Sequence, residues 1–264
     1  DEALKAAISK WMETYDDFDK SEKASDALVS VLESVAASGS ADAESANVIL
    51  RYKDQLSKKT FWMYGGDGWA YDIGFGGLDH VVASGEDFNI LIVDTEVYSN
   101  TGGQSSKATQ VGAVAQFAAA GKKRPKKNLG EMLMTYGNVY VAQVAMGADN
   151  AQLIRAIHEA EQFKGPSIIV AYAPCIEHGI MRGMQNVQEE MKRAVDAGYW
   201  FLYRYNPNAE PKFQLDSKEP TLDYEEFLDG EVRYASLRRT FPENAKKLFA
   251  EGTPIAKERY ESLK

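Results

Sequence analysis

The 264-residue sequence predicts an α/β fold, a doubly wound and mostly parallel sheet with helices on both faces. Short apolar and β-branched runs alternate with longer segments whose apolar residues recur every three or four positions. The runs at 88–93, 139–144 and 167–173 are almost continuously apolar, as strands of a parallel sheet covered on both faces are. Helical spacing over 69–84 and 150–163 places a helix between successive strands.

The chain is expected to have three parts. Residues 1–58 form a helical lead-in, with amphipathic helices at 3–15, 25–35 and 47–56. Residues 59–205 form the α/β core, which also includes helices at 128–136 and 187–197 and an aromatic strand at 199–205. From residue 206 several prolines interrupt the pattern. Residues 206–264 are therefore expected to form an extended, peripheral arm with short helices at 224–228 and 231–239 and a last one from 243.

A glycine-rich turn follows the first predicted strand of the core. The strand covers 61–64, and Gly65, Gly66, Asp67 and Gly68 separate it from the next helix. Ligands of parallel sheets bind beyond the carboxyl ends of the strands, and free N–H groups at a helix start favour a phosphate. Asp67 would repel a phosphate unless a divalent cation bridges the two, and Mg²⁺ is the usual cation among oxygen ligands.

A second loop, 94–100, follows the strand at 88–93 and supplies further oxygen ligands. Thr95 offers a hydroxyl, Val97 a backbone carbonyl and Asn100 an amide. One carboxylate, one hydroxyl and one carbonyl leave octahedral positions of Mg²⁺ for phosphate oxygens and water. The two loops together predict a metal–diphosphate site, whereas the first alone is also typical of a plain tight connection.

The sequences of both loops resemble those of one family. GGDGWAYDIGFGGLDH at 65–80 and DTEVYSNTGGQSSKAT at 94–109 are similar to the C-terminal thiamine diphosphate domain of the pyruvate:ferredoxin (or flavodoxin) oxidoreductases. The resemblance is strong over about 61–179 and implies a thiamine diphosphate-binding fold. Thr95 stands where many thiamine enzymes have Asn, and this family also has Thr there.

The resemblance implies roles for individual residues. Asp67, Thr95 and the carbonyl of Val97 would bind Mg²⁺, and Asn100 would lie near the reacting carbon. The residues expected around the cofactor are Gly66, Asp67, Gly68, Trp69, Thr95, Glu96, Val97, Tyr98, Ser99 and Asn100.

The single cysteine, Cys175, follows the strand at 167–173 within APCIEHGI. A lone cysteine is most often a small buried hydrophobe, although thiolates also bind iron–sulfur clusters. The resemblance implies that Cys175 binds the [4Fe–4S] cluster nearest the thiamine, with the other three ligands outside this chain, which is therefore interpreted as a fragment. His178 is interpreted as structural.

The resemblance further implies an activity. Pyruvate would be oxidatively decarboxylated to acetyl-CoA and CO₂, with electrons passing through [4Fe–4S] clusters to ferredoxin or flavodoxin. Partners would be coenzyme A, the remaining domains of the enzyme and a second copy in a homodimer. No glutamate for activating the thiamine is found, so the chain alone is expected to be inactive. Alternatives are a different 2-oxoacid, a non-redox decarboxylase, against which Cys175 counts, and a non-catalytic module that binds a phosphate or nucleotide.

Composition excludes other classes. The net charge of −9 disfavours nucleic-acid binding, and no apolar run approaches the roughly 20 residues of a membrane span. One cysteine excludes an internal disulfide framework and suits a reducing, cytoplasmic setting.

Two stretches allow more than one interpretation. KKRPKK at 122–127 is expected to be a solvated loop, with docking of an acidic electron carrier or a phosphate-bearing cosubstrate as the alternative. Residues 111–120 are predicted to form a buried helix of small residues, which allow a partner or another part of the core to approach closely.

Overall fold

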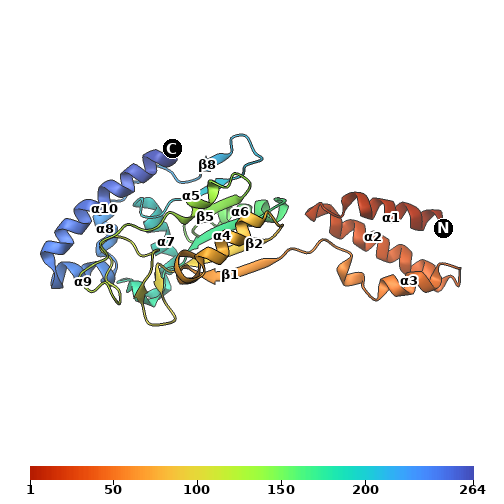
Figure 1. The fold of residues 1–264 in the computed structure, drawn as a ribbon, viewed down its shortest axis with the longest axis horizontal. Helices are drawn as coiled ribbons and strands as arrows, with labels where there is room; N and C mark the ends of the chain where they lie inside the picture. Colours follow the sequence, from red (N-terminus) through yellow and green to blue (C-terminus); the bar gives the residue numbers. More distant parts are fainter. The chain divides into compact units, whose positions relative to one another are not determined.

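The computed structural model describes all 264 residues, which divide into two compact units, Asp1–Phe61 and Trp62–Lys264 (Figure 1). The first unit is helical. Leu28, Leu32 and Val35 are buried at its centre, and the Trp11 indole N–H donates to the Leu56 carbonyl at 2.7 Å. Its helices are α1 (Glu2–Thr14), α2 (Phe18–Ala37), α3 (Ala43–Leu50) and the short 3₁₀ turn η1 (Lys53–Gln55).

The second unit is built on one six-stranded sheet with the order β1-β2-β6-β5-β7-β8. The first four strands in that order are parallel, and the last two are antiparallel at the edge. The strands are β1 (Trp62–Gly66), β2 (Asn89–Asp94), β5 (Tyr140–Val144), β6 (Ser167–Tyr172), β7 (Tyr203–Tyr205) and β8 (Phe213–Leu215). The predicted α/β class with a mostly parallel sheet is confirmed.

Both faces of the sheet are covered, because successive strand residues point to opposite sides. Ile169 of β6 packs with Ala156 and Ala160 of one helix, whereas its neighbours Ile168 and Val170 belong to the larger core on the other face. The helix on the first face is α6 (Asn150–Gln162), and those contributing to the larger core include α4 (Phe75–Ser84), α5 (Leu129–Met134) and α7 (Val187–Asp196).

The connections at the carboxyl ends of the strands contain short elements. They are the π-helix η2 (Gly68–Ile73), the two-stranded ribbon β3 (Val97–Tyr98) with β4 (Gln104–Ser105), and the 3₁₀ turns η3 (Ile176–His178) and η4 (Met184–Asn186). The helix predicted over 69–84 is therefore divided into η2 and α4 at Gly74.

The prediction of a helix over 111–120 was wrong. This stretch consists of turns, because Gly112, Phe117 and Gly121 have left-handed φ values of 83°, 65° and 84°. Its small residues instead make room for the C-terminal helix. A Cβ on Gly112 would lie 2.7 Å from the Phe249 ring.

The segment after residue 206 packs more tightly than a peripheral arm would. It adds β8 to the sheet, and Phe227, Tyr234, Leu237 and Phe249 are fully buried in the main core. Its helices are α8 (Tyr224–Asp229), α9 (Val232–Thr240) and the long α10 (Pro242–Leu263). The boundaries proposed at 58 and 205 stay a prediction, and the structure divides the chain after Phe61.

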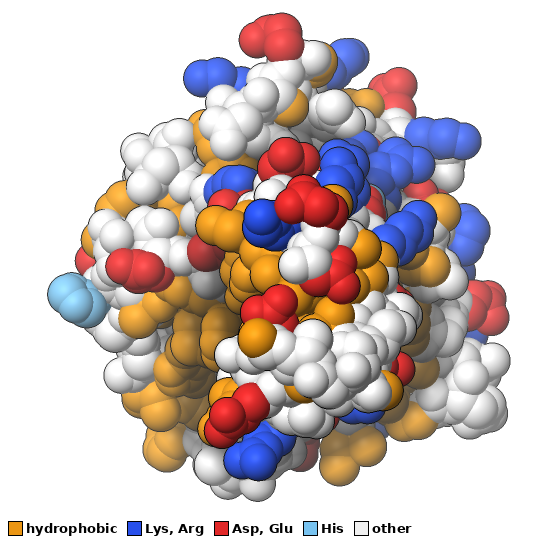
Figure 2. Space-filling model, turned by 90° about the vertical axis from the view of Figure 1, so that its right-hand side faces the viewer, with side chains coloured by type: hydrophobic (Ala, Val, Ile, Leu, Met, Phe, Trp, Pro, Cys, Tyr) orange, Lys and Arg blue, Asp and Glu red, His pale blue; other side chains and the backbone are white.

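The surface adds two observations. Figure 2 shows both acidic and basic side chains on the face that it draws, with several of the basic ones toward the upper right. No helix in the chain combines the length and the apolar character needed to cross a membrane.

Candidate functional site

Asp67 and Thr95 meet at the carboxyl edge of the sheet. Asp67 directly follows β1, and Thr95 directly follows β2, so the parallel pairing of these strands brings the two residues together. Asp67 is buried, and its Oδ1 accepts hydrogen bonds from the Thr95 hydroxyl at 2.8 Å and the Thr95 N–H at 3.2 Å. Its Oδ2 accepts from the Ser106 hydroxyl at 2.8 Å. The carboxylate is thus fixed from both sides.

The carbonyl of Val97 completes a group of three oxygens. It accepts from the same Thr95 hydroxyl at 3.0 Å. Neighbouring ligands of an octahedral Mg²⁺ at about 2.1 Å lie roughly 3 Å apart, close to both hydroxyl distances. No three His, Cys, Asp or Glu side chains gather into a metal-binding group, so a cation here would depend on this mixed oxygen set. The residues fit a hard divalent cation in donor type and spacing.

The Asp67 carboxyl has an unusual pKa. Burial raises the pKa to about 6, and the nearby Asp94 carboxylate adds to the rise, while hydrogen bonds from Ser106 and Thr95 oppose it. Burial therefore makes the charged form of Asp67 less favourable than it is in water, although a pKa of about 6 still leaves the carboxyl mostly ionised at neutral pH. A bound divalent cation would favour the charged form and lower this pKa.

The glycines around Asp67 permit close packing. A Cβ on Gly68 would lie 2.4 Å from the Tyr98 ring, and one on Gly65 would lie 2.2 Å from the Trp69 ring. Neither glycine has a left-handed φ, so their role is close approach of aromatic rings, not the sharp backbone turn that the sequence suggested. Gly66 is exposed with open space where a Cβ would stand, which leaves its backbone accessible.

The side chain of Glu96 is turned away from Asp67. It is fully buried, and its carboxylate accepts from Arg233 at 2.7 Å and from the Tyr199 hydroxyl. The backbone of Glu96 is engaged as well, because its N–H donates to Asp94 at 3.1 Å and its carbonyl accepts from the Thr109 hydroxyl, so the predicted cofactor contact of Glu96 has no unengaged group in this structure. Ser99 is half-buried and Asn100 is exposed in the loop that continues from Val97.

The basic run 122–127 is a loop, as expected, but only its residues 123–125 are exposed, whereas Lys122, Lys126 and Lys127 are partly buried. Lys122 donates to the Ser106 carbonyl at 2.7 Å, and Lys127 donates to the Tyr71 carbonyl at 3.2 Å. Lys126 is buried and forms an ion pair with Asp94 at 2.7 Å. These lysines anchor the loop beside the candidate site. Composition did not reveal this, because the same charges are typical of exposed loops.

Ser106 and Asp94 are further residues that the sequence did not single out. Both lie inside the motif at 94–109, but no spacing rule marks Ser106 as the partner of Asp67. Asp94 is buried, and it accepts from the Tyr71 hydroxyl at 2.7 Å. Burial raises the pKa of the Asp94 carboxyl, an effect that Lys126 opposes.

Cys175 lies just beyond the end of β6, at the same edge of the sheet. Its side chain is half-buried, with Sγ 3.6 Å from His178 Nδ1, and its N–H donates to that nitrogen at 3.1 Å. Burial raises the pKa of the thiol, but contacts with His178 and Ser99 outweigh burial and leave the pKa below its usual value. These contacts therefore favour the thiolate, the form that binds metals, more than water does. His178 is fully buried and closes this turn, in keeping with its structural interpretation.

Comparisons with known proteins identify the family of this chain. The family described as "Thiamine pyrophosphate enzyme, C-terminal TPP binding domain" matches residues 33–171. A pyruvate:ferredoxin oxidoreductase of Moorella thermoacetica is 54% identical over 99% of this chain and 23% of its own length. A pyruvate-flavodoxin oxidoreductase of Klebsiella pneumoniae is 60% identical over 79% of this chain and 18% of its own. The chain thus spans about a fifth of these relatives.

A solved structure of 2-oxoglutarate:ferredoxin oxidoreductase from Magnetococcus marinus is similar at 19% identity. The match covers 66% of this chain and 60% of that one, with a TM-score of 0.42.

Proposed function

We propose, from the premise that the chain belongs to the thiamine pyrophosphate enzymes and carries their C-terminal TPP binding domain, that it holds Mg²⁺ and thiamine diphosphate in a pyruvate:ferredoxin or pyruvate:flavodoxin oxidoreductase. The observation that carries this proposal is the contact of Asp67 Oδ1 with the Thr95 hydroxyl, and of that hydroxyl with the Val97 carbonyl. A relative at 54% identity over almost the whole chain supports the choice of activity.

In this proposal the cation is held by Asp67, Thr95 and the Val97 carbonyl. Ser106 keeps Oδ2 of Asp67 occupied, which leaves Oδ1 on the side of Thr95 and the cation. A cation held there would offset the repulsion between Asp67 and a diphosphate. The accessible backbone at Gly66 and the loop after Val97 would hold the diphosphate.

The chemistry itself belongs to the cofactor. When bound, thiamine diphosphate supplies the electron sink that allows a 2-oxoacid to lose CO₂. The residues of this chain bind and orient it, and the exposed amide of Asn100 is available to contact pyruvate. Residues from other domains or from a second copy would complete the site.

Cys175 is proposed to give one thiolate to a [4Fe–4S] cluster whose other ligands lie outside this chain. Its lowered thiol pKa and its position at the same sheet edge as Asp67 support this role. Electrons from pyruvate oxidation would pass through such clusters to ferredoxin or flavodoxin, the acceptors in the names of the two relatives. Coenzyme A would take the acetyl group.

Removal of the metal tests the site directly. In the complete protein, calorimetric titration with thiamine diphosphate should show tight binding in Mg²⁺, and at least about a tenfold loss of affinity after treatment with EDTA. Adding Mg²⁺ back should restore the affinity. Equal affinity with and without the metal would contradict the proposed role of Asp67 and Thr95.

A further inference from the structure

We infer that Lys126 is a positioning residue for the metal-binding loop, which it holds by contacting the acidic residues on both sides of Thr95. This inference rests on the proposed function, because it concerns how the same loop keeps its oxygens in place. Lys126 belongs to the basic run 122–127 and is not one of the residues predicted to touch the cofactor.

The contacts of Lys126 lead to both flanks of Thr95. Its Nζ lies 2.7 Å from Asp94 Oδ2 and 3.4 Å from Glu96 Oε1, and it donates to the Ala108 carbonyl at 2.9 Å. Its side chain is 6% exposed, and both carboxylates are fully buried. One buried ammonium therefore joins the residue before Thr95 to the residue after it.

Two aromatic rings fix the direction of the Lys126 side chain. Its Nζ lies 5.2 Å from the centroids of the Tyr71 and Trp200 rings. A cation over an aromatic face is attracted by the ring. The Tyr71 hydroxyl also donates to Asp94 at 2.7 Å, so the ring and the ammonium hold the same carboxylate.

The loop needs this support. Two buried carboxylates so close together repel each other unless a cation lies between them. Glu96 also has a left-handed φ of 61°, a strained conformation for a residue other than glycine. This turn at Glu96 lets the Val97 carbonyl reach back to the Thr95 hydroxyl at 3.0 Å. If Lys126 were neutral, Thr95 and the Val97 carbonyl would no longer be held at the spacing that the cation requires.

Arg233 supports only one side of the loop. It donates to Glu96 at 2.7 Å and to the Tyr199 hydroxyl at 2.9 Å, but its ion pairs do not include Asp94. Among the charged side chains of this cluster, Lys126 is the one that contacts both carboxylates.

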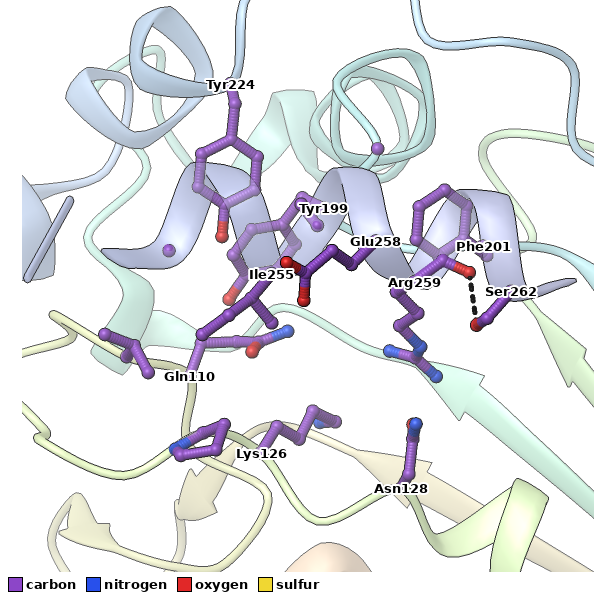
Figure 3. A pocket seen from close by; sticks show the side chains of 15 residues that line it. Gln110, Lys126, Asn128, Tyr199, Phe201, Tyr224, Ile255, Glu258, Arg259 and Ser262 are labelled. Atoms are coloured by element: carbon purple, nitrogen blue, oxygen red, sulfur yellow. Dashed lines mark hydrogen bonds between the residues drawn. The ribbon is translucent and has the colours of Figure 1, made fainter. Parts of the chain in front are cut away.

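The Lys126 stem borders a cavity of about 410 Å³ between its own loop and α10. Figure 3 shows Lys126 on the side of this cavity opposite Ile255, Glu258 and Arg259 of α10. A small molecule can therefore reach the space that a shortened side chain would leave. This provides a test of the ammonium group itself.

The first test measures Mn²⁺ affinity in the complete protein with saturating thiamine diphosphate, by electron paramagnetic resonance of the free ion. Lys126→Met should bind Mn²⁺ about tenfold more weakly, at the low end of the losses seen for outer-shell partners, because Lys126 contacts the neighbours of Thr95 and not a ligand itself. Lys127→Met is the matched control, because Lys127 is also partly buried and contacts the Tyr71 carbonyl and the Phe75 ring, but neither carboxylate. It should stay within about threefold of wild type.

The second test keeps the inference falsifiable if Lys126→Met folds poorly. Lys126→Ala should lose affinity similarly, and n-propylammonium should restore most of it, whereas n-propanol of similar size should not. Wild-type affinity in Lys126→Met, an equal loss in Lys127→Met, or the same response to both rescue compounds would overturn the inference. Wild-type protein that binds no Mn²⁺ would instead contradict the proposed function.

Discussion

Asp67→Asn is expected to remove Mg²⁺-dependent thiamine diphosphate binding. The substitution keeps the shape of the side chain but removes the only carboxylate in the proposed ligand set. Because loss of an outer-shell partner already costs roughly 10–100-fold in metal affinity, loss of this ligand should cost at least about 100-fold. Titration calorimetry of the complete protein with Mg²⁺ and thiamine diphosphate measures this loss.

The same variant should not be less stable without ligands. The pKa of Asp67 is raised to about 6 from its ordinary value of 3.8, mainly by burial. When a carboxyl has a higher pKa in the folded state than in the unfolded state, the folded protein loses stability as the pH rises from the unfolded-state pKa to the folded-state pKa. At pH 8 the neutral amide of Asn avoids this cost. Ligand-free Asp67→Asn should therefore melt at the same temperature as wild type or higher, and its free energy of unfolding should be larger by up to about 3 kcal/mol.

The combination of these two results identifies the role of Asp67. A lower melting temperature together with lost binding would mean that Asp67 is needed for folding. Unchanged binding of Mg²⁺ and thiamine diphosphate would place the metal elsewhere. Thr95→Val is a useful companion, because it removes a second ligand and leaves the carboxylate in place.

Cys175→Ala is expected to remove one iron–sulfur cluster from the complete protein. A [4Fe–4S] cluster held by cysteine thiolates loses a ligand, so iron should fall by about four atoms per chain. Thiamine diphosphate affinity should change little, because Asp67, Thr95 and Val97 are untouched. Iron analysis and calorimetry on the same sample measure both quantities.

Ser99→Ala provides the control for Cys175→Ala. Ser99 lies beside the thiol and contributes to its lowered pKa, but it offers no sulfur ligand. The control variant should keep its full iron content. Full iron in Cys175→Ala would show that the thiol is a packing group, as lone half-buried cysteines often are.

Strand positions were predictable from the sequence, because buried parallel strands are almost continuously apolar. The runs at 88–93 and 167–173 match β2 and β6 to within a residue. With the strands in register, the meeting of Asp67 and Thr95 followed from the rule that ligands lie at the carboxyl ends. This part of the candidate site depended on local pattern and topology alone.

Other features depended on contacts between distant parts of the chain. The stretch 111–120 has helical composition, but left-handed residues and the approach of Phe249 determine its path. Lys126 looks like any exposed lysine in sequence, and its burial follows from the position of Asp94 and Glu96. Likewise, the apolar residues of 224–249 alternate with many charged residues, so the sequence pattern did not show that these apolar side chains belong to the main core.

The central claim is that Asp67, Thr95 and the Val97 carbonyl bind the cation that carries thiamine diphosphate. A crystal structure of the complete protein with thiamine diphosphate and Mn²⁺, recorded for anomalous scattering from manganese, tests it most directly. We predict an anomalous peak about 2.1–2.2 Å from Asp67 Oδ1, Thr95 Oγ1 and the Val97 carbonyl oxygen, next to the diphosphate. A diphosphate bound without manganese at these three oxygens would contradict the claim.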